Sequence, residues 1–468
     1  MTDIHFGTDG WRGVIAEDFN IANARTVVQA IMGYIGASPG GGRVAVGYDN
    51  RFMSEVYARA AAEIVAGNGG TALVSSAPVT TPMLSHAVKA GGCAGGVMVT
   101  ASHNPCIYNG IKFKASYGGS ATKDIASAIE ALIGKSRPAM LQYDSALAAG
   151  KAVERDFFPG YLEHLLRSVD TETIGRSGIR AVVDCMHGSS GHYAARLWDS
   201  LGLEARVLHA GRDPYFGGTN PEPVEANLSA LVEVMRGNGY DLGIALDGDA
   251  DRFTVVDSDG SFVTPHQVFA LLMMHLRKNR KLDGLVVKTV STSTLIDRLA
   301  ADLGLKVVET PVGFKHICAH MLNEDVLIGG EENGGIGFKG YLPERDGLLS
   351  SLMLVEMMAA EGRGLRELLS ALEKRYGPHC YRRLDLKLSG PVQEPLCEKI
   401  SDRAAEVYRD FGVRQVRAFD GVKVLFDDGS WILFRLSGTE PLLRVYCEAG
   451  DPSRLELLLD RAKEAFLG

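Results

Sequence analysis

The chain has 468 residues, of which 46% are hydrophobic and 23% are charged, a composition typical of globular proteins that bury large cores. Its 49 Lys and Arg residues against 57 Asp and Glu residues leave a net charge of −8, which argues against sequence-independent nucleic-acid binding because that requires a basic face. No apolar stretch reaches the roughly 18 residues of a membrane span, and the N-terminal residues lack the basic and apolar segments of a signal peptide.

Seven cysteines are scattered along the chain without a CxxC pair. This pattern favours neither a zinc ribbon nor a disulfide scaffold, so we expect a cytoplasmic protein. At roughly 150 residues per domain, the length predicts about three or four domains. We expect no nucleic-acid or membrane partner, although a local cluster of Lys and Arg can still bind an anionic small substrate.

Helices and strands alternate along most of the chain. Apolar residues recur at helical spacing between Ile21 and Ile35. A second helix is expected to begin near Ser54, which can cap it, and to run toward Gly67. Strands are predicted at residues 43–47, 71–75 and 96–100. Such alternation is typical of parallel sheets with crossover helices.

A helix that ends at a glycine and leads into a short strand recurs three times. The segments are 63–76, 199–210 and 301–311, and the second and third share the residues LGL. The pattern is common in any α/β protein, but three occurrences in a similar order favour three related α/β domains. We place these domains at residues 1–149, 150–257 and 258–374.

The C-terminal stretch has a different pattern. A strand near residue 380 is followed by a predicted helix at 394–411. Three strands are predicted next, at 422–426, 431–435 and 443–448, before a final helix at 453–466. This order predicts a smaller α+β domain at residues 375–468.

A polar loop follows the buried-looking strand that ends near Thr100. The loop reads TASHNP, and the carboxyl ends of strands in such sheets are where ligands bind. Ser102 is a candidate nucleophile, with His103 as a polar neighbour. Because an ordinary Ser/Asn turn has the same composition, this loop alone does not identify a site.

Three carboxylates follow a strand predicted at residues 241–246. Asp247, Asp249 and Asp251 repel one another unless a cation neutralises them, and their hard oxygen ligands suit Mg²⁺. Arg252 can hold a phosphate or order the carboxylates. The alternative is a solvated acidic turn, which is disfavoured because three charges at the end of a core strand are costly without a partner.

Two further loops carry groups that suit a phosphosugar. The glycine-rich segment 329–335 contains Glu331 and Asn333, which can bond sugar hydroxyls. The segment 435–441 turns sharply after a strand, and its polar groups can converge on one anion. Those groups belong to Arg435, Ser437, Gly438 and Thr439. For both segments the alternative is a plain hairpin turn.

A serine nucleophile, Mg²⁺ ligands, hydroxyl-binding groups and an anion site together indicate phosphoryl transfer on a phosphosugar. The residues alone leave two enzymes open, a serine phosphatase and a phosphosugar mutase. They also leave open a sensor that binds a phosphosugar without reaction.

The motifs, in their order, resemble those of the α-D-phosphohexomutase superfamily from end to end. They are FGTDGWRG (6–13), TASHNP (100–105), NGIKF (109–113), DGDADR (247–252), VGFK (312–315), GEENGG (330–335) and RLSGTEP (435–441). The resemblance implies an α/β fold, with three related α/β domains containing mixed sheets and a smaller C-terminal α+β domain around a central cleft.

The resemblance also implies roles for individual residues. Ser102 would carry the phosphoryl group and, together with Asp247, Asp249 and Asp251, would hold Mg²⁺. The residues placed for proton transfer or charge stabilisation are Arg12, His103 and Lys112. The residues placed for substrate binding are Arg252, Lys288, Lys315, Glu331, Asn333, Arg435, Ser437, Gly438 and Thr439.

The implied reaction interconverts hexose 1-phosphate and hexose 6-phosphate through a phosphoserine enzyme and a hexose 1,6-bisphosphate. Asn333 stands where many relatives have Ser, and Gly335 stands where some mutases of mannose and glucosamine phosphates have His. The missing histidine favours glucose as the sugar. Phosphomannomutase or phosphoglucosamine mutase specificity stays open, as does a serine-dependent sugar phosphatase. We expect a monomer or a homodimer.

Overall fold

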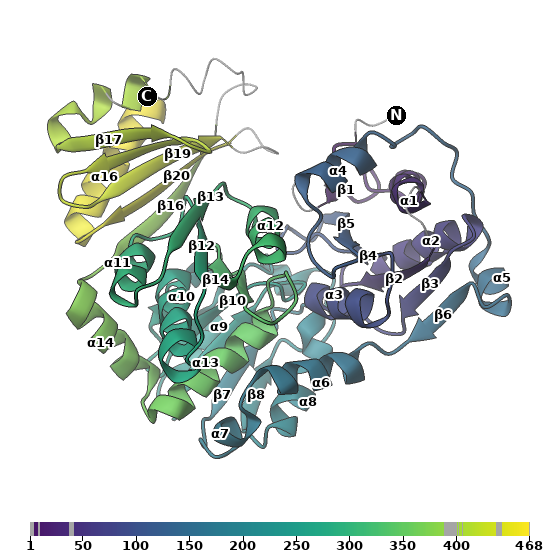
Figure 1. Cartoon of the computed structure of the whole chain (residues 1–468), viewed down its shortest axis with the longest axis horizontal. Coiled ribbons are helices and arrows are strands. Elements are labelled where there is room, and N and C mark those ends of the chain that lie inside the picture. The colour runs from purple at the N-terminus through teal and green to yellow at the C-terminus, as the bar shows by residue number, and fades with distance from the viewer. Residues whose placement is uncertain are drawn as a thin grey trace. The chain divides into compact units, whose positions relative to one another are not determined.

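The computed structural model describes residues 4–7, 10–36, 42–387, 400, 402–404, 406–436 and 442–467. Contacts within the chain define two compact units. The first consists of Met1–Val287 and Gly313–Leu368, and the second of Lys288–Val312 and Leu369–Gly468. The strands of the described residues form four sheets, which Figure 1 shows.

The first sheet has the strand order β1-β5-β4-β2-β3-β6. Its strands are β1 (Trp11–Val14), β2 (Arg43–Tyr48), β3 (Thr71–Ser75), β4 (Gly95–Val99), β5 (Tyr108–Ala115) and β6 (Ala152–Arg155). The helices of this part are α1 (Ile21–Gly36), α2 (Ser54–Gly67), α3 (Thr81–Ala90), α4 (Lys123–Glu130) and α5 (Tyr143–Ala148). The buried faces of α1 and α2 share one apolar core with the sheet, because both helices carry apolar residues at helical spacing.

The second sheet has the order β11-β10-β9-β7-β8. Its strands are β7 (Ala181–Asp184), β8 (Ala205–Leu208), β9 (Leu242–Leu246), β10 (Phe253–Asp257) and β11 (Phe262–Val263). The neighbouring helices in the chain are α6 (Phe158–Ser168), α7 (Thr171–Gly175), α8 (Ala194–Ser200) and α9 (Ser229–Met235). Strand β7 is parallel to β8 and β9, whereas β10 is antiparallel to β9.

The third sheet has the order β13-β12-β14-β15. Its strands are β12 (Leu285–Thr289), β13 (Val307–Thr310), β14 (Val326–Gly330) and β15 (Ile336–Phe338). The helices in this part of the chain are α10 (Pro265–Met274), α11 (Leu295–Asp302), α12 (Phe314–Asn323), α13 (Gly347–Glu361) and α14 (Leu365–Tyr376). Strand β15 is antiparallel to β14.

The same strand order occurs in all three sheets. It reads β5-β4-β2-β3 in the first, β10-β9-β7-β8 in the second and β15-β14-β12-β13 in the third. In each, one helix (α2, α8 or α11) leads into the last strand of this order, as the recurring helix–glycine–strand pattern predicted. Three related α/β domains with mixed sheets are therefore confirmed. The alternation of helices and strands by itself indicated parallel sheets, whereas each of these sheets also contains an antiparallel strand.

That antiparallel strand determines where the polar loops lie. In each sheet a central strand turns back through a short loop into its antiparallel neighbour, as β4 into β5, β9 into β10 and β14 into β15. We call these connections the serine loop (residues 100–107), the aspartate loop (247–252) and the glycine-rich loop (331–335). The related folds therefore carry their polar motifs at equivalent places.

The C-terminal sheet is antiparallel, with the order β16-β20-β19-β18-β17. Its strands are β16 (Cys380–Lys387), β17 (Val413–Ala418), β18 (Val422–Phe426), β19 (Trp431–Leu436) and β20 (Leu442–Ala449). Helix α16 (Pro452–Leu467) packs on it in a shared apolar core. Strand β17 was not predicted, and it occupies residues adjacent to the end of the helix expected at 394–411. Of that helix, residues 400, 402–404 and 406–407 are helical, 409–411 form a 3₁₀ turn, and 394–399, 401 and 405 lie outside the described residues.

Ser54 is not the cap of α2. It is the first helical residue, and Met53 precedes it in the left-handed conformation with φ of 60°. The Ser54 hydroxyl instead donates to Asp49 Oδ1 at 2.9 Å. The prediction was wrong because a tertiary partner competes for the hydroxyl that would otherwise satisfy the helix terminus.

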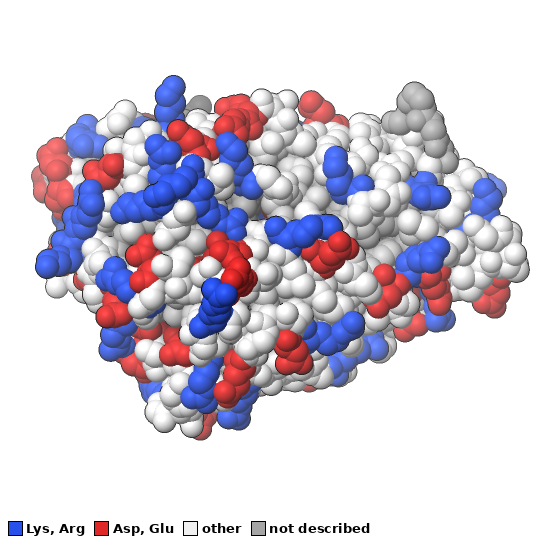
Figure 2. Space-filling view, turned by 60° about the horizontal axis from the view of Figure 1, so that its bottom comes forward, with Lys and Arg blue, Asp and Glu red and all other residues white. Residues whose placement is uncertain are grey.

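Charged groups of both signs share the surface. On the face drawn in Figure 2, Lys and Arg side chains lie interspersed with Asp and Glu side chains. Exposed pairs such as Arg180 with Glu204 at 3.1 Å add little stability, because water screens them. Within the described ranges, every helix is too short or too polar to traverse a lipid bilayer.

Candidate active site

Ser102 lies in a conformation that serine rarely adopts. It follows β4 with φ of 52°, in the left-handed region where a Cβ is crowded. Its backbone N–H donates to Thr100 Oγ1 at 2.9 Å, and its carbonyl accepts from Arg51 Nη2 at 2.6 Å. Its hydroxyl donates to Asp247 Oδ2 at 2.8 Å. A strained residue held by several partners is typical of a functional position.

Arg51 binds the backbone of the serine loop, and this role was not predicted from the sequence. Its side chain is fully buried, and its Nε lies 3.3 Å from Asp49 Oδ2. Its two Nη groups donate at 2.6–3.0 Å to the carbonyls of Ser102, Asn104, Pro105 and Tyr108. One guanidinium therefore fixes the path of the loop that presents the serine.

Replacing Arg51 with Met is expected to lower the free energy of unfolding by about 3–5 kcal/mol, because Asp49 would stay buried without its cation. Hexose phosphate turnover should fall as well, since the serine loop loses its support. Urea unfolding and a mutase assay measure the two effects. Arg59→Met is the control, because Arg59 is half exposed and forms its ion pair with Glu55 one helical turn away. Equal stability of the two variants would contradict this role.

The three aspartates converge in the loop between β9 and β10. Asp247, Asp249 and Asp251 are fully buried, and one oxygen from each lies within 4.8 Å of the others. Among the described residues, this is the one group of metal-ligating side chains with that geometry. Gly248 brings the loop against the serine loop, since a Cβ there would lie 2.5 Å from the carbonyl oxygen of Ser102.

Three cations surround the aspartates, two of them from other elements. Lys112, on β5, places its Nζ 2.8 Å from Asp249 Oδ2 and 3.0 Å from Asp251 Oδ2. Arg345 donates from Nη2 to Asp251 Oδ2 at 2.8 Å. Arg252 Nε lies 3.8 Å from Asp251 Oδ1. Three positive side chains therefore face three carboxylates in a buried cluster.

This cluster shifts the pKa values of two of its carboxyl groups in opposite directions. Burial raises the pKa of Asp247 well above its usual range, and the charges of Asp251 and Asp249 add to the effect. Burial also acts to raise the pKa of Asp251, but Arg345, Lys112 and Arg252 together hold it well below its usual range. The three cations therefore favour the ionised form of Asp251.

The residues present fit a magnesium ion. Asp249 Oδ1 and Asp251 Oδ1 are buried and have no hydrogen-bond partner within the described part of the chain, a costly arrangement unless a cation binds them. Asp247 Oδ2 and the Ser102 hydroxyl lie beside each other in the same cluster. Carboxylate and hydroxyl oxygens are the hard ligands that Mg²⁺ prefers.

The glycine-rich loop lies against the same cluster. Glu331 is buried, and its Oε2 accepts from Arg345 Nη1 at 2.8 Å. Asn333 Oδ1 accepts from the backbone N–H of Gly335 at 3.0 Å. Gly334 has φ of 88°, and a Cβ there would lie 2.1 Å from the Phe253 carbonyl oxygen. The loop is therefore the turn of the β14–β15 hairpin, and its contact with Phe253 fixes its path.

The remaining predicted residues of the first unit are near the serine loop or on α12. Arg12, on β1, donates from Nη1 to Asn104 Oδ1 at 2.7 Å. Burial lowers the pKa of His103 well below its usual range, and Arg252 and Arg12 add to this effect. This environment therefore favours the neutral form of the imidazole. Lys315 is half-buried in the first turn of α12.

Two of the predicted residues that the structure describes belong to the second unit. Lys288 Nζ pairs with Asp297 and donates to the Ser293 carbonyl at 3.2 Å. Arg435 Nε donates to Asp420 Oδ2 at 2.9 Å at the end of β19. The other residues predicted for this phosphate loop, Ser437, Gly438 and Thr439, lie outside the described residues.

A run of three buried charged residues before α13 was also not predicted from the sequence. Glu344 accepts from Lys114 Nζ at 2.6 Å, and Arg345 contacts the aspartate and glycine-rich loops. Asp346 caps α13 through the Leu349 N–H at 3.0 Å. Burial raises the pKa of Asp346 to about 6. The signal in the sequence was a PERDG segment directly before an apolar helix.

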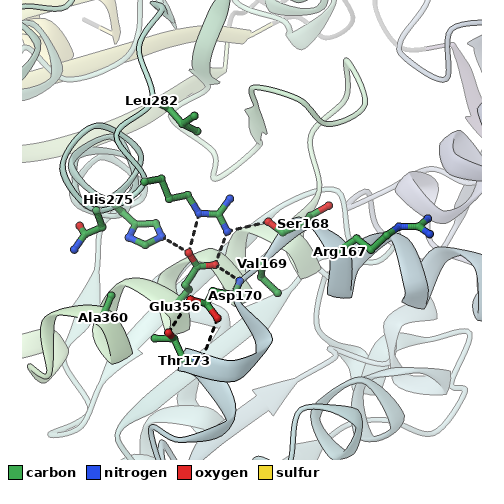
Figure 3. Close-up of a pocket in the computed structure, with 11 residues that line it drawn as sticks. Arg167, Ser168, Val169, Asp170, Thr173, His275, Leu282, Glu356 and Ala360 are labelled. Atoms are coloured by element: carbon green, nitrogen blue, oxygen red, sulfur yellow. Dashed lines mark hydrogen bonds and ion pairs between the residues drawn. The ribbon is translucent and has the colours of Figure 1, made fainter.

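A cavity of about 500 Å³ lies elsewhere and shares no lining residue with this cluster (Figure 3). At its wall, Glu356 accepts from His275 Nε2 at 3.0 Å, from Arg280 Nε at 2.7 Å and from the Asp170 N–H at 2.9 Å. Burial acts to raise the pKa of Glu356, but the bonds from His275 and Arg280 hold it at about 2. The network therefore joins three segments of the chain.

Comparison with known proteins agrees with this geometry. Four models of the phosphoglucomutase/phosphomannomutase family match in order: alpha/beta/alpha domain I at 3–140, domain II at 159–260, domain III at 264–376 and the C-terminal domain at 397–465. A phosphoglucomutase/phosphomannomutase of Thermococcus kodakarensis is 33% identical, over 99% of both chains. A phosphoglucosamine/phosphogalactosamine mutase of Sulfurisphaera tokodaii is 31% identical, again over 99% of both.

A solved structure from Thermus thermophilus matches with a TM-score of 0.88 and 35% identity, over 100% of both chains. The similarity thus extends over all four domains and includes the loops that hold the serine, the aspartates and Glu331. The chain therefore belongs to the phosphoglucomutase/phosphomannomutase family and is a phosphohexomutase, an isomerase that transfers a phosphoryl group within its sugar substrate.

Proposed function

We propose that the protein interconverts hexose 1-phosphate and hexose 6-phosphate, with glucose as the preferred sugar, by way of a phosphorylated Ser102. The observation that carries this proposal is the position of the Ser102 hydroxyl, 2.8 Å from Asp247 Oδ2 at the edge of the buried aspartates. A serine held in a strained turn beside a cation site is placed to accept and return a phosphoryl group.

In the proposed reaction, a free hydroxyl of the hexose monophosphate attacks the phosphorus on Ser102. The bond from phosphorus to Oγ breaks as the new bond to the sugar oxygen forms, giving a hexose 1,6-bisphosphate. The hydroxyl proton passes to a basic group, and the Ser102 oxygen regains a proton. After the bisphosphate turns end for end, Ser102 takes the other phosphoryl group by the same step in reverse.

The chain's own residues organise this transfer. Asp247, Asp249 and Asp251, with Ser102, would hold Mg²⁺, which when bound supplies positive charge next to the transferring group. Lys112 and Arg252 keep the aspartates in place and add charge. Arg12, His103 and Lys112 remain the proposed groups for proton transfer or charge stabilisation.

Substrate recognition is proposed for the other loops. Glu331 and Asn333 would bond sugar hydroxyls, while Lys288 and Lys315 would add positive charge. Arg435 would join Ser437, Gly438 and Thr439 around the phosphate that is not transferred, because a guanidinium fork suits a phosphate. The proposed domains 1–149, 150–257, 258–374 and 375–468 would each contribute one loop. The six described cysteines are free thiols, and we propose a cytoplasmic monomer or homodimer.

Glucose 1-phosphate is expected to be the best substrate, with mannose 1-phosphate also used. Glu331 and Asn333 are expected to contact hydroxyls away from C2, the carbon at which these two sugars differ. Gly335 has no side chain that could contact the hydroxyl at C2. A coupled assay with hexose 1,6-bisphosphate present, run on the 1-phosphates of glucose, mannose and glucosamine, ranks them by kcat/KM. A strong preference for glucosamine phosphate would overturn this ranking.

Glucosamine phosphate is the second candidate sugar, because the Sulfurisphaera tokodaii relative is named a phosphoglucosamine/phosphogalactosamine mutase. The same assay separates the two sugars. It also tests for a phosphatase, which would release inorganic phosphate without isomerising the sugar, and for a sensor, which would bind without either reaction.

A further inference from the structure

Arg345 connects the loop proposed to bind the sugar with the loop proposed to bind the metal. Its Nη1 donates to Glu331 Oε2 at 2.8 Å, and its Nη2 donates to Asp251 Oδ2 at 2.8 Å. The side chain is 4% exposed, and its guanidinium lies 5.6 Å from the centre of the Phe314 ring. A planar fork held at both ends in this way fixes the separation of two carboxylates.

Gly335 leaves the space through which Arg345 passes. A Cβ at residue 335 would lie 2.6 Å from Arg345 Cδ, closer than real Cβ atoms approach a neighbour. The backbone of Gly335 does not require glycine, because it is not among the residues with positive φ. A side chain at residue 335 would therefore displace the arginine, and its Cβ would also lie 3.3 Å from both Asn333 Oδ1 and Glu331 Oε2.

Arg345 is one of three cations in a cluster that holds four carboxyl groups. The cations Lys112, Arg252 and Arg345 face the carboxyl groups of Asp247, Asp249, Asp251 and Glu331. Arg345 thus has two effects on the site. It holds Glu331 in place, and its positive charge partly offsets the negative charge of the aspartates that would bind the metal. These two effects predict opposite consequences when the residue is changed.

We propose that Gly335 and Arg345 form a matched pair that positions Glu331 for the sugar and moderates the affinity of the aspartates for the metal. Arg345 is a positioning residue, since it acts through Glu331 and Asp251. This inference rests on the proposed function of the two loops.

Arg345→Met removes the fork and the charge but keeps most of the volume. Binding of glucose 1-phosphate should weaken roughly tenfold or more, as expected when a charge-assisted bond to a buried carboxylate is lost. Binding of Mn²⁺ should tighten by roughly threefold or more, because a positive charge leaves the vicinity of the cation. Damage to the fold of the site would instead weaken both.

Arg345→Lys and Gly335→Ala separate the two effects. The lysine restores the charge without the fork, so Mn²⁺ affinity should return toward the parent value while sugar binding stays weak. The alanine displaces the arginine, so it should weaken sugar binding about as much as Arg345→Met. The double variant should bind glucose 1-phosphate less weakly than the sum of the two single losses predicts, because the fork to Glu331 is already absent when the methyl group is added.

The experiment is carried out on the full chain in a Ser102→Ala background, in which no phosphoryl group can be present on residue 102 or be turned over there. Glucose 1-phosphate binding is measured by calorimetry, and Mn²⁺ binding by the electron paramagnetic resonance of the free ion. Gly364→Ala and Arg176→Met are the matched controls. A Cβ at 364 meets no described atom within 4 Å, and Arg176 is an exposed residue paired with Glu172.

Opposite shifts for sugar and Mn²⁺ in Arg345→Met, together with a non-additive double variant, would support the proposal. Weakening of both ligands, or losses for Gly335→Ala and Arg345→Met that add in full, would overturn it. Either of those results would leave hexose phosphate interconversion by the unmodified enzyme unaffected. A failure of this inference is therefore distinct from a failure of the proposed function.

Discussion

Ser102→Ala is expected to lower hexose phosphate interconversion by roughly a thousandfold or more, because the variant has no oxygen to carry the phosphoryl group. The fold should remain, since the change removes the hydrogen bond that the hydroxyl donates to Asp247 at 2.8 Å, and losing such a bond costs about 1 kcal/mol. The coupled assay measures the rate, and thermal unfolding measures the stability.

Ser85→Ala is the matched control for this change. Ser85 is also fully buried in the first domain, and its hydroxyl has no hydrogen-bond partner among the residues that the structure describes, so its loss should leave turnover near normal. Near-normal turnover in Ser102→Ala would refute the assignment of this serine as the phosphoryl carrier.

Asp249→Asn is expected to weaken metal binding and to reduce turnover by roughly a hundredfold or more. An amide oxygen carries no full charge for a hard cation, and a lost electrostatic contact to the transferring group has an effect of about this size. Asp249 Oδ1 is one of the buried oxygens that no described residue hydrogen-bonds. Titration of the activity with Mg²⁺ should show a requirement for a much higher concentration.

Asp257→Asn provides the comparison for loss of a buried carboxylate. Asp257 lies at the far end of β10 and pairs with Arg366 at 3.3 Å, so the Mg²⁺ requirement should not change there. Treatment of the unmodified enzyme with a chelator should also abolish activity, and added Mg²⁺ should restore it. Full activity in the chelator would rule out a catalytic metal.

The sequence predicted the polar loops because each has a local signal. Ser102 and Asp247 follow apolar runs that end abruptly in polar residues, and the structure shows these runs as β4 and β9. The recurring helix–glycine–strand segments likewise predicted three related domains, since each segment contains its helix end and its strand within about a dozen residues. Local patterns were therefore sufficient for the fold class and for the position of the loops.

The residues that hold those loops were not predictable in the same way. Arg51 contacts the serine loop from more than fifty residues away in the chain, and Arg345 is 94 residues from Asp251. Nothing near either arginine in the sequence indicates which loop it contacts. A buried charge acquires its role from elements that only the tertiary fold brings together.

Strand β17 was missed for a different reason. Its residues Val413–Ala418 include two arginines and a glutamine, it lies at the edge of the sheet, and its pairing with β18 is interrupted between Val413 and Gln415. The interruption removes the strict alternation of apolar and polar residues that identifies a strand. Its partner β18 has no such interruption with β19 and was predicted correctly.

The central claim is that the phosphoryl group passes through Ser102. Mass spectrometry of peptides after incubation with glucose 1,6-bisphosphate tests it most directly, followed by quenching at short times after glucose 1-phosphate is added. We expect one phosphate on the peptide that contains Ser102. After glucose 1-phosphate is added, this phosphate should be lost at least as fast as the enzyme turns over. The amount of bisphosphate formed should equal the amount of phosphate lost from the peptide. An unmodified peptide, or inorganic phosphate released in place of bisphosphate, would contradict the claim.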